Sequence, residues 1–149
     1  MLINLSNHSS TNWSDEQKKE ALRLFGGLTN MVFPLIDPNL DTNAIEKLAD
    51  EYLRQIRLFQ LNLTDSLIPY LFHNEQNDKV SHQTESPLVV HLMGELTFCF
   101  ALASRLQQYD IRCVVSTTER IADEQNGLKL SQFNFVKFRD YPSCLPYID

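Results

Sequence analysis

Short apolar runs alternate with helix-like patterns along the chain. Four of these runs have the length of buried strands and are bounded by polar residues, glycine or proline, at 2–5, 29–33, 88–92 and 111–116. Three segments with apolar positions at helical spacing lie between them, at 15–25, from Thr42 to before residue 61, and at about 95–108. This alternation predicts an α/β fold with a mostly parallel sheet.

The predicted helix ends carry local signals. Ser14 with Gln17 three residues later has the capping-box pattern, and Gly26-Gly27 is typical of a helix stop. Thr42 is the expected N-cap of the second helix. Trp13, directly before Ser14, is interpreted as a hydrophobic staple rather than a stacking platform.

Residues 61–86 interrupt the alternation and are interpreted as an insertion within a single domain spanning 1–149. The first half is apolar enough to pack, as a short helix broken at Pro69. The second half, HNEQNDKVSHQTES, is polar and predicts a loop. The insertion could cover the sheet, cap a site or contribute to a dimer interface.

The C-terminal part predicts a β-hairpin around Asn126-Gly127, between 121–124 and 129–138. Within its second strand, the spacing of Phe133, Phe135, Val136 and Phe138 predicts a bulge or a change of buried face. Together these elements predict a Rossmann-like sandwich with a mostly parallel sheet and a C-terminal β-hairpin.

Composition narrows the class of protein. The 149 residues are 43% hydrophobic and 21% charged, as in ordinary globular domains. The net charge of −6 argues against broad binding of duplex nucleic acid, but it leaves room for a small phosphorylated ligand. No signal peptide and no apolar run of about 18 residues is visible, so we expect a cytoplasmic protein that does not span a membrane. Cys99, Cys113 and Cys144 are interpreted as buried thiols in a reducing compartment.

Three polar clusters follow predicted strands, and the carboxyl ends of parallel strands share one edge of a sheet. The clusters are Ser6-Asn7-His8, Gly94-Glu95-Leu96-Thr97 and Ser116-Thr117-Thr118-Glu119-Arg120. We therefore expect one crevice lined by all three.

Each cluster has a chemical and a structural interpretation. His8 is either a general acid or base or a solvated loop histidine. The helix start at Gly94 is either an anion cradle of N–H groups, with Thr97 adding a hydroxyl, or a tight turn in which Glu95 stabilises the helix dipole. Glu95 would repel a phosphate and could instead bind a ribose hydroxyl or an adenine amine. His91 is expected to be a hydrogen-bonded core histidine.

The third cluster offers hydroxyls and a guanidinium that could bind a phosphate, or it is a polar edge with a surface Glu–Arg pair. Neither the dinucleotide fingerprint nor the P-loop motif is present. The histidines at 73 and 82 lack metal-ligand spacing, so no metal and no cofactor is expected.

The chain resembles the CRISPR-associated ring nucleases, which are related to the CARF (CRISPR-associated Rossmann fold) domains of type III systems. The similar stretches are LINLSNH at 2–8, HLMGE at 91–95, STTER at 116–120 and FVKFRDY at 135–141. The resemblance covers most of the chain outside 61–86.

The resemblance implies a homodimer that binds a cyclic oligoadenylate second messenger and switches off antiviral signalling by cleaving it. Cleavage would be metal-independent, by attack of a ribose 2′-hydroxyl on the adjacent phosphate. By position, the residues implied in chemistry are His8, Thr118 and Arg120, and those implied in ligand binding are Ser6, Asn7, Gly94, Glu95, Thr97, Ser116 and Thr117. The alternatives are a non-catalytic sensor or sink for the same ligand, and a scaffolding protein.

Overall fold

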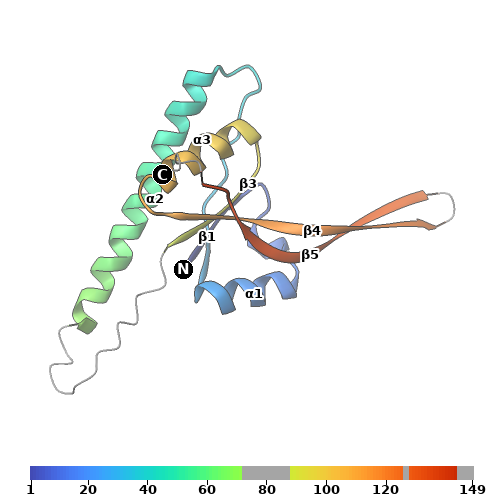
Figure 1. Cartoon of the computed structure of the whole chain (residues 1–149), viewed down its shortest axis with the longest axis horizontal. Helices are drawn as coiled ribbons and strands as arrows, with labels where there is room; N and C mark the ends of the chain where they lie inside the picture. The colour runs from blue at the N-terminus through green and yellow to red at the C-terminus, as the bar shows by residue number, and fades with distance from the viewer. Residues whose placement is uncertain (72–87, 126–127, 144–149) are drawn as a thin grey trace, which may run out of the picture.

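The described strands form one five-stranded sheet with the order β2-β1-β3-β4-β5 (Figure 1). The computed structural model describes residues 1–71, 88–125 and 128–143. The first four strands are parallel: β1 (Leu2–Ser6), β2 (Leu28–Asn30), β3 (Val89–Met93) and β4 (Arg112–Gln125). β5 (Leu128–Asp140) is antiparallel to β4. The predicted α/β class, mostly parallel sheet and C-terminal hairpin are confirmed.

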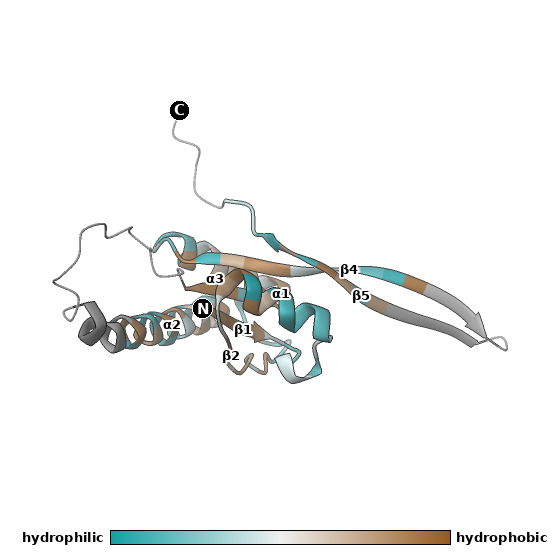
Figure 2. Ribbon diagram, turned by 90° about the horizontal axis from the view of Figure 1, so that it is seen from below, coloured by the Kyte–Doolittle hydropathy of each residue, from teal (hydrophilic) through white to brown (hydrophobic). Residues whose placement is uncertain are grey.

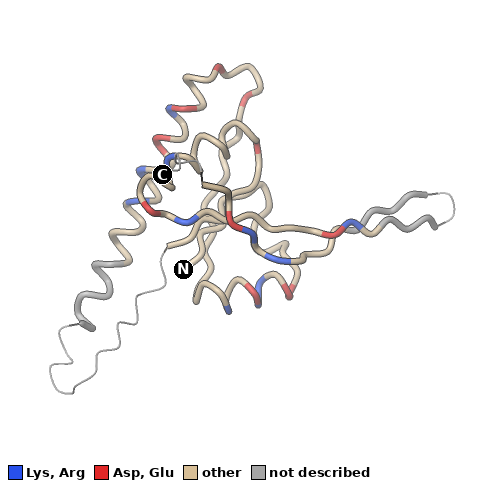
Figure 3. Tube along the Cα trace, in the orientation of Figure 1, with Lys and Arg blue, Asp and Glu red and all other residues tan. Residues whose placement is uncertain are grey.

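Helices lie on both faces of the sheet. α1 (Asp15–Phe25) covers one face, and α2 (Thr42–Leu71) and α3 (Leu96–Gln107) pack together on the other (Figures 1 and 2). A short 3-10 helix, η1 (Ser10–Asn12), precedes α1. Figure 3 shows acidic and basic residues interspersed along α1 and the hairpin, a distribution that keeps these surfaces solvated.

Two apolar clusters hold these layers together. The larger lies between the sheet and α2 and α3, and its fully buried side chains include Ile3, Leu5, Ile56, Val90, Leu92, Phe98, Leu102 and Leu106. The smaller lies under α1 and contains Leu2, Trp13, Ala21, Phe25, Val89 and Val114. Because side chains alternate along a strand, Asn4, Ser6 and His91 share the α1 face with Leu2 and Val89, but nearer the carboxyl ends of the strands.

The local signals of α1 are confirmed. The Ser14 hydroxyl accepts a hydrogen bond from the Gln17 N–H (3.2 Å), and Gly26 ends the helix with a φ of 72°, in the left-handed region that glycine tolerates best. The buried side of α1 is narrower than the apolar positions of this helix predict, because Leu22 and Leu24 are exposed.

The second helix differs from prediction at both ends. Asp41, not Thr42, is its N-cap, since the Asp41 carboxylate accepts from the Ala44 N–H (2.8 Å). The helix then continues to Leu71, so the insertion boundary at residue 61 and the break at Pro69 are wrong. Phe59 and Leu63 carry the apolar stripe onward and contact the larger core, which explains the continuation. The rest of the predicted insertion, with its two histidines, lies outside the described residues.

The strand limits also change. β2 ends at Asn30 rather than at residue 33, because the chain leaves the sheet and the Val32 carbonyl accepts a hydrogen bond from the hydroxyl of Tyr52 on α2. β4 does not end at Ser116: it continues to Gln125, paired with β5 as a ribbon that projects from the molecule (Figures 1 and 2). The predicted turn at 126–127 lies outside the described residues.

The predicted bulge is confirmed. Thr117 pairs with Lys137 while Thr118 pairs with Phe135, so Val136 is the extra residue of β5. Lys137 and Arg139 are exposed.

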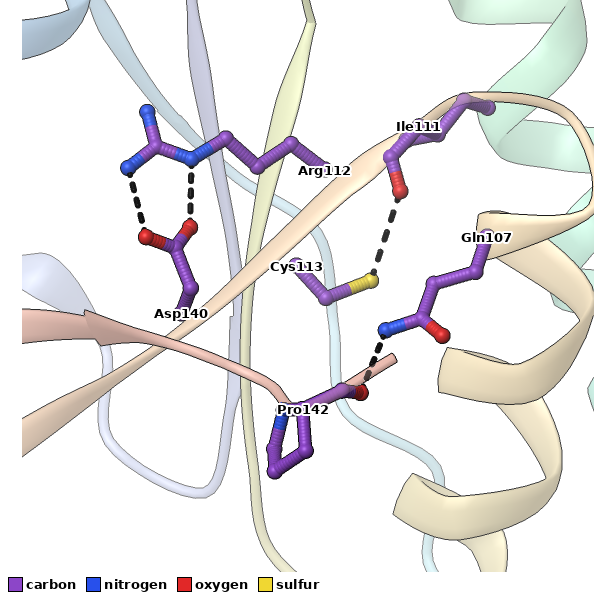
Figure 4. A network of polar contacts seen from close by, with 6 residues as sticks. All are labelled: Gln107, Ile111, Arg112, Cys113, Asp140 and Pro142. Carbon is purple, nitrogen blue, oxygen red and sulfur yellow. Dashed lines mark hydrogen bonds and ion pairs between the residues drawn. The ribbon is translucent and has the colours of Figure 1, made fainter. Parts of the chain in front are cut away.

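The base of the hairpin is tied to the body of the protein (Figure 4). Arg112 on β4 forms a bidentate ion pair with Asp140 on β5, and the Gln107 side chain donates to the Pro142 carbonyl (2.9 Å). The Tyr141 hydroxyl donates to the Leu92 carbonyl (2.9 Å) on β3. These contacts fix the direction in which the ribbon leaves the sheet.

Candidate functional site

The polar ends of β1 and β3 and the middle of β4 lie at one edge of the sheet. Ser6 is in register with Met93, and the Ser116 hydroxyl contacts the Met93 sulfur at 3.7 Å. The winding of the chain reverses between β1 and β3, because α1 lies on one face and α2 and α3 on the other. Open α/β sheets bind ligands beyond the carboxyl ends of the strands at such a reversal.

A line of hydrogen bonds crosses four strands on the α1 face. The Asn4 amide nitrogen donates to the Asn30 side-chain oxygen (2.9 Å), and the Asn4 oxygen bonds Nδ1 of His91 (2.9 Å). Nε2 of His91 accepts from the Ser116 N–H (3.1 Å) and lies 2.9 Å from the Ser116 hydroxyl. These bonds connect β2, β1, β3 and β4 through their side chains, near the carboxyl ends of β1 and β3.

His91 is neutral in this arrangement. It is almost fully buried, and burial lowers the pKa of His91 from 6.5 to about 4. The Trp13 ring packs edge-on against it with centroids 5.0 Å apart. The interpretation of His91 as a hydrogen-bonded core histidine is confirmed. Trp13 packs on His91 and Phe138 and belongs to the same apolar cluster as Ala21 and Phe25 of α1.

The loop after β1 is anchored through its backbone. The Asn4 amide donates to the His8 carbonyl (2.9 Å), the Ser6 hydroxyl accepts from the His8 N–H (3.3 Å), and the Asn7 N–H donates to the Met93 carbonyl (3.1 Å). The side-chain oxygen of Asn30 also accepts a hydrogen bond from the Ser10 N–H (3.0 Å). The His8 side chain is exposed on this fixed backbone.

One cavity of about 450 Å³ opens beside this line, and we call it the hydroxyl–aromatic cavity. It lies between the α1 face of the sheet, the start of α1 and the hairpin. Its lining consists of Ser6, His8, Asn12, Trp13, Ser14, Gln17, His91, Met93, Ser116, Thr118, Phe133 and Phe135. Among these residues there is no Lys, Arg, Asp or Glu, so hydroxyls, amides, imidazoles and aromatic rings determine what it can bind.

A second cavity of about 610 Å³ lies on the other side of the β1 loop, toward β2. Ser6 lines both cavities, and the second is otherwise lined by Asn4, Asn7, Ser9, Asn30 and the segment 31–35. The β1 loop therefore separates two openings at the same edge of the sheet, and Asn7 belongs to the second.

The helix start at Gly94 is not an open anion cradle. The Glu95 carboxylate caps α3, accepting from the N–H groups of Thr97 (3.1 Å) and Phe98 (2.8 Å) and from the Thr97 hydroxyl (2.8 Å). These bonds lower the pKa of Glu95. The interpretation in which Glu95 stabilises the helix is confirmed, and the expectation of free N–H groups is wrong because the chain's own carboxylate binds them.

Gly94 and Thr97 also lie apart from the hydroxyl–aromatic cavity. A Cβ at Gly94 would lie 2.2 Å from the Phe33 ring, so glycine is needed for this close approach. Thr97 lines a third cavity, of about 700 Å³, between the start of α2 and α3. The expected crevice shared by all three polar clusters is therefore formed by two of them.

The third cluster lies within a strand rather than at a strand end. Ser116, Thr118 and Arg120 are on the α1 face, and the Arg120 guanidinium lies over the Phe133 ring, 6.0 Å from its centroid. Thr117 is on the opposite face, where its hydroxyl donates to the Lys137 carbonyl (3.1 Å). Thr117 cannot act together with Thr118 on one phosphate, because alternation along the strand separates them.

Sequence reasoning missed several residues of the site. Asn4 and Asn30 belong to the line of hydrogen bonds across the strands. Trp13, Phe133 and Phe135 form the aromatic part of the lining of the hydroxyl–aromatic cavity. A polar residue inside the apolar run LINL was the available signal for Asn4. Within the described ranges, no group of His, Cys, Asp and Glu is arranged to hold a metal ion, and no helix has the length and hydropathy to cross a membrane.

Comparisons with known proteins place the chain in a family without a described activity. Neither a curated protein nor a solved structure gives a significant match. A family model described as "Uncharacterized protein MJ1673 family" matches residues 1–139, which is nearly the whole chain. By this match, the chain belongs to the uncharacterized protein MJ1673 family.

Proposed function

We propose that this protein is a ring nuclease with a Rossmann-like domain that binds cyclic oligoadenylate and cleaves it, and so switches off type III CRISPR signalling in the cytoplasm. The resemblance of the polar stretches to ring nucleases supports the proposal. The observation that carries it is the hydroxyl–aromatic cavity, which combines the His8 imidazole with the hydroxyls of Ser6, Ser116 and Thr118. In this proposal the active form is a homodimer.

The cavity contains the groups that such a reaction needs. A ribose 2′-oxygen attacks the adjacent phosphorus and loses its proton to His8, the bond from phosphorus to the 5′-oxygen breaks, and the protonated His8 returns the proton to the 5′-oxygen. The products are a 2′,3′-cyclic phosphate and a 5′-hydroxyl, so no water, metal or cofactor enters the balance. Ser116 and Thr118 donate to the phosphate oxygens, and Arg120, two residues farther along the same face of β4, adds positive charge.

The test is cleavage of cyclic tetra- and hexa-adenylate in EDTA, followed by chromatography of the products. We expect linear products with a cyclic phosphate end, and a loss of at least about 100-fold in rate in His8→Ala. Thr118→Val should also lose activity, whereas Thr42→Val, the same change on the distant α2, should not. Intact ligand at high enzyme concentration would remove the enzymatic part of the proposal.

A second candidate is a non-catalytic sensor or sink for the same ligand. It is favoured by one observation: the described residues that line the hydroxyl–aromatic cavity include no Lys or Arg to stabilise the charge that develops on phosphorus. Calorimetry separates the two candidates, because the sensor binds cyclic oligoadenylate tightly and releases it unchanged. Light scattering with and without ligand tests the dimer.

A further inference from the structure

The hairpin contributes an exposed aromatic ring to the outer end of the hydroxyl–aromatic cavity. Phe133 on β5 is 63% exposed and lines the cavity. A large apolar ring left in water forgoes the stabilisation that burial would provide. A ligand with a flat apolar face would restore that burial.

Phe133 ends a row of rings that begins in the core. Phe138 packs against Trp13 and Phe25 (5.9 and 5.5 Å between centroids), and Phe135 lies 5.0 Å from Phe138. The bulge at Val136 brings Phe138, Phe135 and Phe133 to one face of β5. The row therefore runs from the buried Trp13 and Phe25 through two half-buried rings, Phe138 and Phe135, to the exposed Phe133, and its inner end holds the row in place.

The polar groups of the cavity suit the edge of a heterocycle better than a phosphate. Those away from His8 and Thr118 are hydroxyls and amides without net charge, namely Asn12, Ser14 and Gln17. Neutral donors and acceptors recognise the edge of a base, whereas phosphate binding in proteins relies on cations or on helix N-termini. The guanidinium of Arg120 lies over Phe133, at the outer end of the cavity.

We propose that the hydroxyl–aromatic cavity is a nucleobase subsite in which a purine stacks on Phe133. This inference deepens the proposed function and rests on it for the identity of the natural ligand, but the stacking itself needs only a purine. The phosphate of the proposed reaction lies at the mouth of the same cavity, beside the exposed His8 and on the side of Arg120, so the base rather than the phosphate fills the interior. Stacking on an exposed aromatic side chain is sequence-tolerant and contributes strongly to the binding of single bases.

Trp13 provides the measurement. It is the single tryptophan of the chain and lines the same cavity, so its fluorescence reports occupancy. We expect adenosine to change Trp13 fluorescence saturably, with an affinity within a few-fold of that of AMP and nearly independent of salt. Ribose 5-phosphate should leave the fluorescence unchanged. A phosphate subsite would reverse this order and would depend strongly on salt.

Variants at two exposed phenylalanines supply the test and its control. Phe133→Ala should weaken adenosine binding about tenfold or more, and Phe133→Tyr should retain it. Phe100→Ala, the same change at a similarly exposed ring (65%) on α3 and outside the cavity, should have no effect. Since both residues are exposed, the melting temperatures should match that of the wild type, which separates lost binding from lost folding.

The outcomes distinguish this inference from the proposed function. Binding of cyclic tetra-adenylate that is unchanged in Phe133→Ala overturns the stacking role and leaves the ring nuclease proposal standing. A Phe133-dependent response to adenosine without any binding of cyclic oligoadenylate supports the base subsite and overturns the ligand proposal. A change of oligomeric state in Phe133→Ala with unchanged adenosine binding overturns the inference by making the ring a protein contact.

Discussion

The main-chain N–H of Ser116 donates a hydrogen bond to Nε2 of His91, and this bond decides the tautomer of the imidazole. With Nε2 as the acceptor, the proton resides on Nδ1 and is donated to the Asn4 side-chain oxygen. The Asn4 amide group is then oriented so that its nitrogen faces Asn30 and the His8 carbonyl. A residue of β4 thus determines the orientation of a side chain on β1 that holds the catalytic loop of the proposed enzyme.

Acid should destabilise the protein through His91. The pKa of His91 is lowered to about 4, so between about pH 6.5 and pH 4 the unfolded chain binds a proton that the folded chain does not. The free energy of unfolding should therefore fall as the pH drops through this range, by at most about 3 kcal/mol from this group. Urea denaturation at several pH values measures the slope, which His91→Gln should reduce. An equal slope in the variant would assign the acid sensitivity to other groups.

Asn4 should be intolerant of an isosteric acid. Asn4→Asp removes the N–H groups that donate to the His8 carbonyl and to the side-chain oxygen of Asn30. It also places a buried carboxylate next to the Asn30 oxygen, which repels it. We expect a loss of at least about 2 kcal/mol in the free energy of unfolding, measured by denaturant titration. Asn43→Asp, in the exposed first turn of α2, is the control and should be neutral or slightly stabilising. A neutral Asn4→Asp would show that the line across the sheet contributes little.

Gly94→Ala should destabilise the protein through Phe33. The new Cβ would lie 2.2 Å from the Phe33 ring, which is packed edge-on against Phe98 with centroids 5.4 Å apart. The expected cost is about 1–3 kcal/mol in thermal or urea unfolding. Phe33→Leu in the same chain should recover part of that cost, because the clash is with the ring.

Gly27→Ala is the matched control for this change. Its Cβ would approach the flexible end of the Met1 side chain at 2.9 Å, so a smaller loss is expected. Additive costs for Gly94→Ala and Phe33→Leu would argue against the clash as the cause.

Glu95→Ala should weaken α3 at its start. The substitution leaves the N–H groups of Thr97 and Phe98 without their carboxylate, at an expected cost of about 1 kcal/mol, and Glu95→Gln should cost less. Because the pKa of Glu95 is lowered, this contribution is present at neutral pH and is lost as the pH falls through the folded-state pKa. Chemical denaturation of both variants at neutral and acidic pH measures the difference. An unchanged midpoint in Glu95→Ala would mean that water replaces the cap.

Features that depend on a few neighbouring residues were predictable from the sequence. The Ser14 cap and the Gly26 stop of α1 are local, and the crowding of phenylalanines on β5 indicated the bulge. The end of β4 was not predictable in this way. Polar residues at 116–120 are typical of a loop, but here the pairing with β5 satisfies their backbone groups and carries the strand onward.

The site depended on contacts that no local pattern contains. His91 and Asn4 are 87 residues apart, and only the register of β1 on β3 brings them together. Phe133 reaches the cavity because β4 and β5 pair with a one-residue bulge at Val136. The spacing of the aromatic residues indicated this bulge, but it did not show which face of the sheet the rings would occupy. Glu95 had two interpretations from the sequence, and the hydrogen bonds to Thr97 and Phe98 decide between them.

The bulge at Val136 decides which side chains of β5 lie on the face that meets the ligand. Plain alternation continued from Phe138 would place Val136 and Asn134 on the α1 face and turn Phe133 and Phe135 to the opposite face, with Phe138 still packed against the core. The backbone conformation at Val136, rather than any one side chain, thus determines the outer wall of the cavity, and a chain without Val136 would reach the same wall by regular alternation.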